Sequence, residues 1–472
     1  MSIILIKTLQ LLLCLSLLVI LHEFGHFGFS KLFHVKVVKF YLFYNPYFHL
    51  FSTRDKWFTR LFPYFKDNET EYGIGWVPLG GYVQIAGMVD ESMDTEQLKQ
   101  PAQPREFRSQ KVWKRFFMMA GGIIMNLLTA WIIYSAVMLA WGRDYVPMQS
   151  IKQGFQFNEY AQELGFRNGD IPVAADGQEI SEYTGAVYRT ISNAGTVTVL
   201  REGKPTDITM PKGGLNMVEM LHMVPSFMTP IAPAVVDSVM PGSAAQQAGM
   251  QAGARLLAVN GKALDTWSDY DYDVTVRRED VLSAKGCTHA DSLQQRQMQV
   301  VWTADGGITR DTASLTLDEN YLMGVTRRTP EFDTKHQQYN LLSCIPAGLE
   351  RGWKQLSGYV NDLKYMASAD GVKSVGSFIT FGSIFPSAWD WQQFWLTTAF
   401  ISIILAVMNL LPIPALDGGH ILFLLIEAIT GRQPSDRIMQ WMEVFGLGLL
   451  AILMLVAFSN DVRNFILPLF GI

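Results

Sequence analysis

The chain alternates between long apolar stretches and a polar middle. Four stretches come near the roughly 20 apolar residues that a helix needs to cross a bilayer. They cover residues 3–29, 116–141, 394–411 and 441–458. The first could instead be a cleaved signal peptide, but its apolar run continues into His-Glu-Phe-Gly-His without a small-residue cleavage site. The pattern therefore predicts a polytopic α-helical membrane protein with four transmembrane helices.

Lys and Arg residues near the helix ends predict the orientation. They cluster within residues 31–39, 111–115 and 432–437. Cytoplasmic loops carry an excess of Lys and Arg. All three clusters fall on one side if both termini face outward. This places them in the cytoplasm and the large segment 142–390 on the opposite side.

The polar middle contains an internal repeat. Residues 164–177 and 248–261 share a small-residue loop, a Gly-ended turn, a short apolar strand and a closing Asx-Gly turn. The repeat resembles two tandem PDZ domains, which are β-rich α+β modules, at 145–220 and 222–326. PDZ domains capture extended peptides by strand addition. Inert spacers or a steric gate over the membrane part remain alternatives.

Composition narrows the classes of function. Charged residues make up 17% of the chain and hydrophobic residues 49%, whereas soluble domains carry about 25% charged residues. Lys and Arg total 38 against 43 Asp and Glu, which gives a net charge of -5. No nucleic-acid partner is expected, because the chain lacks a basic excess. Three cysteines exclude a disulfide-dense scaffold.

The end of the first apolar stretch carries candidate metal ligands. His22 and His26 are four residues apart, so both imidazoles lie on one helix face and can reach one ion. Glu23 lies beside them, where it can take a proton from the attacking water. Ionisable residues inside a spanning helix are expensive and usually functional. The alternatives are a hydrogen-bonded histidine pair in the bundle or a proton relay in a transporter, but the pattern favours zinc.

Catalytic zinc needs a third protein ligand, and the segment NLLPIPALDGGH offers one. Pro412 and Pro414 should end or unwind the third helix there. Asp417 is the best candidate, although it could also cap the next helix, and His420 is a rival. Asn409 could hold a substrate backbone group or stabilise the oxyanion. It could equally serve helix packing.

These motifs resemble one family. HEFGH in the first helix, NLLPIPALDGG at the end of the third and the PDZ-like repeats are similar to the bacterial site-2 protease family of the RseP type. The resemblance implies a zinc-dependent intramembrane endopeptidase that acts in regulated intramembrane proteolysis. It implies His22, His26 and Asp417 as zinc ligands, Glu23 as general acid/base and Asn409 as a substrate-positioning residue.

The resemblance also implies location and substrates. The protein would lie in the bacterial inner membrane, with periplasmic PDZ domains and the active site toward the cytoplasm. Its substrates would be single-pass membrane proteins, such as anti-sigma factors after a first cut by a site-1 protease, or remnant signal peptides.

A helical substrate must be unwound and held extended before cleavage, and the region around residues 70–88 suits that task. It is glycine-punctuated and β-prone, which predicts a membrane-associated β-hairpin with an available edge. Gly73 and Gly75 are predicted to contact substrate, together with Pro412 and Pro414. A plain cytosolic hairpin packed on the second helix is the alternative.

The remaining boundaries follow from the same pattern. The membrane part occupies 1–141 and 391–472, and an amphipathic helix with a hinge occupies 340–390. That helix would lie on the outer membrane interface or pack on the second PDZ domain. Two other functions compete with proteolysis, namely an ion transporter and a PDZ scaffold with a dead metal site. Four helices without an inverted repeat disfavour the transporter, and an intact Glu23 disfavours the scaffold.

Overall fold

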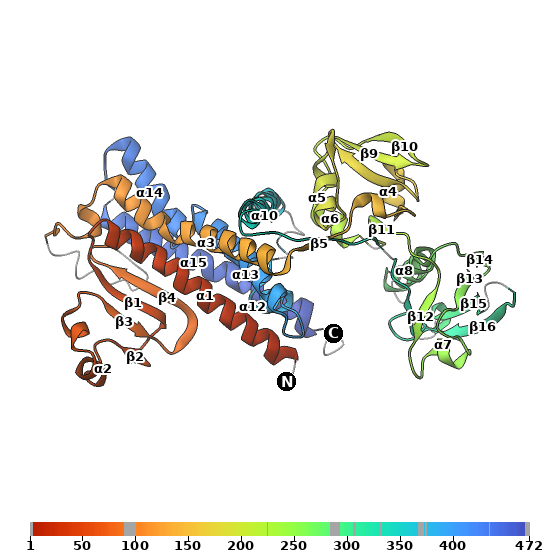
Figure 1. Cartoon of the computed structure of the whole chain (residues 1–472), viewed down its shortest axis with the longest axis horizontal. Coiled ribbons are helices and arrows are strands. Elements are labelled where there is room, and N and C mark those ends of the chain that lie inside the picture. The colour runs from red at the N-terminus through yellow and green to blue at the C-terminus, as the bar shows by residue number, and fades with distance from the viewer. Residues whose placement is uncertain are drawn as a thin grey trace. The chain divides into compact units, whose positions relative to one another are not determined.

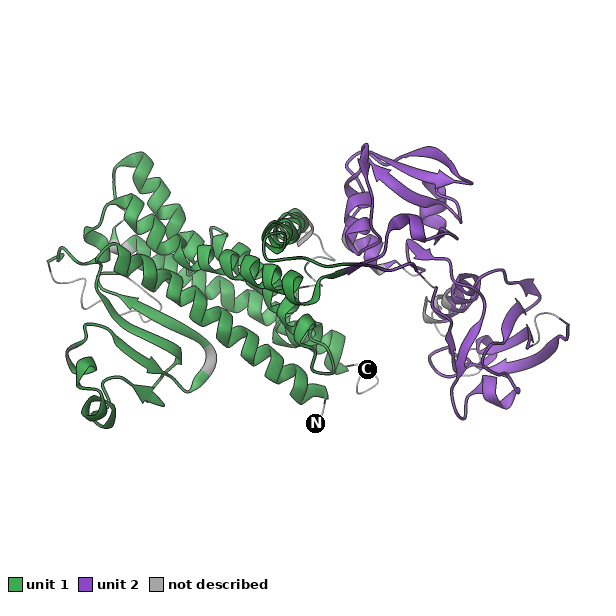
Figure 2. Cartoon of the chain, in the orientation of Figure 1, with its two compact units in different colours: residues 1–143, 337–472 green, residues 144–336 purple. Residues whose placement is uncertain are grey.

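The structure is a computed structural model that describes residues 3–467 apart from 89–100, 224, 284–292, 305–307, 331, 367–371, 373–374 and 434. It divides into two compact units, shown in Figure 2. The first unit combines residues 1–143 with 337–472, and the second covers 144–336.

The first unit contains the four expected spanning helices. They are α1 (Ile3–Leu32), α3 (Val112–Trp141), α13 (Trp391–Leu410) and a fourth over Ile438–Ile466, formed by α15 (Asp436–Asp461) and the π-helical η5 (Val462–Ile466). Each is long and apolar enough to cross a membrane. The described residues therefore contain the predicted number of helices that are able to span a membrane. A further helix, α14 (Asp417–Thr430), lies between α13 and α15 in the chain.

Helix α1 crosses α3 at two glycines, where the backbones touch. A Cβ atom on Gly25 would lie 2.1 Å from the carbonyl oxygen of Gly121, and one on Gly121 would lie 2.6 Å from that of Gly25. Small residues at such crossings let membrane helices approach closely. On another face of α3, the Ser402 hydroxyl of α13 donates to the Asn126 carbonyl at 2.7 Å. Helix α3 thus joins α1 to the C-terminal helices.

A four-stranded sheet follows α1 in the chain. Its strands are β1 (Val37–Tyr44), β2 (Phe51–Ser52), β3 (Glu71–Ile74) and β4 (Val77–Ile85), in the order β2-β3-β1-β4. The segment between β2 and β3 contains α2 (Lys56–Leu61) and the 3₁₀ helix η1 (Pro63–Asp67). Strand β4 forms an edge of the sheet and lies beside α1 (Figure 1).

The predicted hairpin around residues 70–88 is wrong in its pairing. Strands β3 and β4 do not pair with each other, because β1 lies between them, parallel to β3 and antiparallel to β4. The turn that joins them wraps around the end of β1, where Gly75 N–H donates to the Leu42 carbonyl at 2.8 Å and Trp76 N–H to that of Tyr44 at 3.1 Å. Strands β3 and β4 therefore each form their backbone hydrogen bonds with β1 and not with each other.

The C-terminal part of this unit contains two further helices. Helix α10 (Cys344–Met366) packs Leu356, Tyr359 and Leu363 against a buried cluster of α3 and α13. The segment predicted as a hinge contains α12 (Phe378–Ile384). Asp461, at the end of α15, caps this helix by accepting from the backbone N–H groups of Ser377, Ile379 and Thr380.

Apart from α6, the described elements of the second unit follow one order twice. Its first half contains β6 (Phe155–Phe157), α4 (Glu159–Glu163), β7 (Ile171–Ala175), β8 (Gln178–Glu179), α5 (Ala186–Asn193), β9 (Thr196–Arg201), β10 (Lys204–Thr209), α6 (Met217–His222) and β11 (Met228–Pro230). Its second half contains β12 (Val236–Val239), α7 (Ala244–Gln247), β13 (Arg255–Val259), β14 (Lys262–Ala263), α8 (Trp267–Ser283), β15 (Gln297–Thr303), β16 (Asp311–Thr316) and β17 (Val325–Arg327). The sheets β10-β9-β7-β8 and β14-β13-β15-β16 correspond. So do the two-stranded ladders β11-β6 and β12-β17.

Each half has its own hydrophobic core. Phe157, Val199 and Phe227 are buried in the first, and Leu256 and Trp302 in the second. Because β11 pairs with β6, the first half extends to residue 230, past the end expected at residue 220.

Candidate active site

The two histidines of α1 are oriented by α3. His26 Nδ1 lies 2.8 Å from the Met118 carbonyl oxygen, and His22 Nδ1 lies 3.2 Å from the Asn126 side-chain nitrogen. The Nε2 atoms of the two rings face a common point and are 3.2 Å apart. Contacts to the second ring nitrogen fix the orientation and tautomer of a metal-binding histidine. The pair is therefore held in an arrangement suited to one ion.

Asn126 supplies a further detail of this contact. Its Oδ1 atom is buried and has no hydrogen-bond partner in the described structure. The two ends of an amide are assigned from the hydrogen-bond network. With the amide turned over, Oδ1 would accept from His22 Nδ1–H and leave the Nε2 lone pair of His22 free for a metal.

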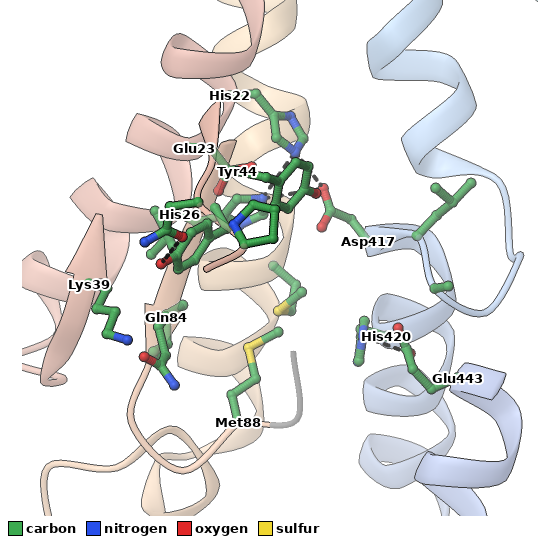
Figure 3. Close-up of a pocket in the computed structure, with 18 residues that line it drawn as sticks. His22, Glu23, His26, Lys39, Tyr44, Gln84, Met88, Asp417, His420 and Glu443 are labelled. Carbon is green, nitrogen blue, oxygen red and sulfur yellow. Dashed lines mark hydrogen bonds and ion pairs between the residues drawn. The ribbon is translucent and has the colours of Figure 1, made fainter. Parts of the chain in front are cut away.

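Asp417 reaches the histidines from the other end of the chain. Helix α13 ends at Leu410 before the two prolines, and Ala415 adopts a left-handed φ of 70°. Such strain in a non-glycine residue concentrates at functional sites. The turn makes Leu416 the N-cap of α14 and Asp417 its first residue. Figure 3 shows the Asp417 carboxylate directed at the imidazoles.

The three side chains form a candidate metal site. Asp417 Oδ2 lies 3.4 Å from His22 Nε2 and 3.5 Å from His26 Nε2. The three candidate ligand atoms all lie within 4.8 Å of one another. The same Oδ2 atom is buried and accepts no hydrogen bond within the described residues. Two imidazoles and one carboxylate form a donor set that suits a catalytic zinc ion, which keeps one position open.

Gly122 of α3 leaves the space that both imidazoles occupy. A Cβ atom there would lie 2.3 Å from His22 Cε1 and 2.6 Å from His26 Nε2. Sequence reasoning missed both Gly122 and Asn126. The available signal was a Gly-Gly pair followed four residues later by an amide in an otherwise apolar helix.

A cavity of about 700 Å³ opens beside the candidate metal site. It is lined by His22, Glu23, His26, Lys39, Tyr44, Asn45, Pro46, Tyr82, Val83, Gln84, Ile85, Met88, Met119, Ala415, Leu416, Asp417, His420 and Glu443. Glu23 therefore faces the same space as the candidate ligands. His420, the rival ligand, is not part of the metal group, and its Nε2 lies 3.7 Å from Glu443 Oε2.

The edge strand β4 passes next to Glu23. A Cβ atom on Gly81 would lie 3.7 Å from Glu23 Cγ and 3.1 Å from Val19 Cγ1. The absence of a side chain at Gly81 lets the strand approach α1 closely. An extended peptide paired with β4 would therefore run close to the candidate general base.

The residues predicted to contact substrate differ in whether they lie at the candidate metal site. Asn409 lies at the site, with its side-chain nitrogen 3.5 Å from His22 Nε2. Gly73 and Gly75 are buried against β1 and do not line the cavity, nor do Pro412 and Pro414. The role of all five in substrate binding stays a prediction.

The geometry defines a class of protein. A bundle of spanning helices carries an HExxH motif, an aspartate as the candidate third ligand and a cavity beside these residues. This combination is expected for an intramembrane metalloprotease. The sequence profile of peptidase family M50 matches residues 10–453. The chain therefore belongs to peptidase family M50.

Named relatives agree with this assignment. A protein of Neisseria meningitidis, provisionally named a zinc metalloprotease, is 27% identical over 97% of this chain and 98% of its own length. The "Regulator of sigma E protease" of Salmonella typhi and the "Protease RseP" of Yersinia pestis are each 27% identical, over 95% of this chain and 97% of theirs. The resemblance inferred from the motifs is confirmed. The chain is a membrane metalloendopeptidase, and the transporter and scaffold alternatives fall away.

Proposed function

We propose that this protein is a zinc-dependent intramembrane endopeptidase that cleaves transmembrane segments of single-pass membrane proteins. The observation that carries the proposal is the buried Asp417 Oδ2, which lacks a hydrogen bond and faces the Nε2 atoms of His22 and His26. A buried carboxylate oxygen that accepts no hydrogen bond is costly. A metal ion would be coordinated by all three of these atoms.

The roles of the residues follow from this arrangement. His22, His26 and Asp417 would hold the zinc, whose Lewis acidity activates water and polarises the scissile carbonyl. Glu23, which lines the same cavity, takes the proton from the attacking water and delivers it to the nitrogen of the leaving amine. Asn409 donates from its side-chain amide to the substrate carbonyl as negative charge develops there.

The edge of β4 would hold the substrate. A helical substrate protects its own peptide bonds, so cleavage requires an extended segment, and strand addition supplies one. Main-chain bonds to β4 would place that segment beside Glu23, because Gly81 brings the strand against α1. The sheet would therefore lie at membrane depth, in contact with the unwound part of the substrate.

The second unit would form two tandem PDZ domains. The repeated order of elements in its two halves supports this assignment. On the outer, periplasmic side of a bacterial inner membrane, these domains would exclude substrates with large outer domains. Helix α10 would lie at the outer membrane interface.

The substrate class follows from the same size limit. Proteins trimmed by an earlier site-1 cut would be admitted, such as anti-sigma factors, and so would remnant signal peptides. The relatives named as regulators of sigma E support the first group.

One experiment tests the mechanism. Glu23→Gln in the purified full-length chain should retain one zinc per molecule yet lose cleavage of a transmembrane peptide in vesicles. The exposed Glu179→Gln of the second unit is the matched control and should behave like the wild type. Full activity of Glu23→Gln would refute its role as general base. A wild type that cleaves without bound zinc would refute the metal site.

A further inference from the structure

A short aromatic segment beside the sheet has little protein cover. This α2–η1 segment (residues 56–67) follows β2, on the side of the sheet opposite the α1 edge (Figure 1). No residue of α2 is buried. Trp57, Leu61 and Tyr64 are 61%, 66% and 81% exposed. A contiguous group of large exposed apolar side chains marks a surface that something else covers.

The exposed side chains are backed by contacts between aromatic rings. The Phe58 ring centroid lies 5.0 Å from that of Phe51 in β2 and 5.4 Å from that of Phe65 in η1. The Arg54 guanidinium donates to the Lys66 carbonyl at 2.6 Å and so ties the two ends of the segment together. Because Phe58 and Phe65 face inward, the segment presents one defined outer face.

The segment ends beside the last turn of α1, a helix long and apolar enough to span a membrane. Thr70 follows it, and its hydroxyl accepts from Lys31 Nζ at 2.9 Å and donates to the Val37 carbonyl at 2.9 Å. Lys31 lies in the last turn of the spanning helix α1. Basic residues at the end of a spanning helix lie at the membrane interface. With α1 spanning the bilayer, the chain on either side of Thr70 would lie at headgroup depth.

The outer face combines apolar and basic side chains. Trp57 and Leu61 are four residues apart and share one side of α2, while Lys56 and Arg60 form the adjoining strip. Within the part of the chain that the structure describes, neither Lys56 nor Arg60 is in an ion pair. Trp, Leu and basic residues in this arrangement are typical of helices that lie in an anionic membrane interface.

We propose that the α2–η1 segment is an interfacial anchor for anionic lipids, on the membrane face where α1 ends. Trp57, Leu61 and Tyr64 insert between the headgroups, and Lys56 and Arg60 contact lipid phosphates. Because the segment is continuous with β2, lipid contact fixes the depth of the sheet and of its β4 edge. The inference depends on α1 spanning the bilayer and is independent of the peptidase reaction.

Spin labelling of the full-length chain tests the anchor. Cys14, Cys287 and Cys344 are replaced by Ala, and one label is placed through Leu61→Cys. The matched control is Leu322→Cys in the second unit, where the native Leu is 53% exposed. In vesicles with roughly 30% phosphatidylglycerol, collisions with a water-soluble nickel chelate should be about fivefold rarer at position 61 than at position 322, with oxygen collisions retained.

Two results would overturn the proposal. Equal nickel collisions at both positions would show that the segment lies in water. Suppression of both nickel and oxygen collisions at position 61 would show that protein, rather than lipid, covers it. Lys56→Gln with Arg60→Gln should raise nickel access in anionic vesicles and leave it unchanged in neutral ones. No change in anionic vesicles would refute the contact with anionic headgroups.

Discussion

Gly122→Ala is the sharpest probe of how α3 supports the candidate zinc site. The added Cβ atom would lie 2.3 Å from His22 Cε1, 2.6 Å from His22 Nδ1 and 2.6 Å from His26 Nε2. Both rings, or the helix that carries the new methyl group, must therefore move by about 1 Å to restore ordinary contact. Distances in a zinc site tolerate only about 0.2 Å.

The expected effect is large. A misplacement of about 1 Å at a catalytic centre can lower the rate about 100-fold, so the Gly122→Ala variant should lose both bound zinc and cleavage. Zinc is measured by mass spectrometry on the purified chain, and cleavage with a transmembrane peptide in vesicles. A thermal unfolding midpoint close to that of the wild type would separate a local effect on the site from misfolding.

Gly28→Ala provides the matched control. Gly28 also lies in a spanning helix, but a Cβ atom there would meet nothing within 4 Å. This variant should keep its zinc and activity and should gain slightly in helix stability, by about 1 kcal/mol at most. Wild-type zinc content and rate in Gly122→Ala would refute the close packing of α3 on the imidazoles.

Three further changes probe the scaffold, each by the thermal unfolding midpoint in detergent. Arg115→Met leaves the buried Glu427 carboxylate without its ion-pair partner and should lower the free energy of unfolding by about 3–5 kcal/mol. Adding Glu427→Leu should recover most of this stability, and no recovery would contradict the charge argument. Asp461→Asn removes the charged acceptor at the start of α12 and should cost about 1.5–3 kcal/mol, with faster proteolysis near residue 377; unchanged proteolysis would contradict the capping role. Phe157→Ala leaves a cavity in the first core of the second unit and should lower the free energy of unfolding by about 3–5 kcal/mol, while the zinc content stays unchanged. A loss of zinc would show that the zinc site depends on this core.

Features that depend on local sequence were predictable. The apolar length of Ile3–Leu32 is a property of one segment, and so is the spacing that puts His22 and His26 on one helix face. The break before Asp417 follows from two prolines. These local rules also explain why the ends of the first three spanning helices differ from prediction by at most four residues, whereas the fourth ends at Ile466 instead of residue 458.

Features that depend on long-range contacts could not be predicted from the sequence. Strand β1 (Val37–Tyr44) is apolar along much of its length, so its sequence lacks the alternating pattern that predicts a strand. No local feature of the sequence indicates that β1 lies between β3 and β4 in the sheet. The short turn at Gly75 favoured a hairpin instead. Gly122 and Asn126 gain importance only from the angle at which α3 crosses α1, which one helix sequence does not encode.

The split of the first unit into two chain segments has a consequence for biosynthesis. His26 and Asp417 are separated by about 390 residues, with the whole second unit between them. At about 5–20 residues per second of synthesis, the histidines wait about 20–80 s for their third partner. The enzyme would therefore stay inactive on the ribosome. It could acquire its metal and attack neighbouring membrane proteins only after its own C-terminal helices have been made.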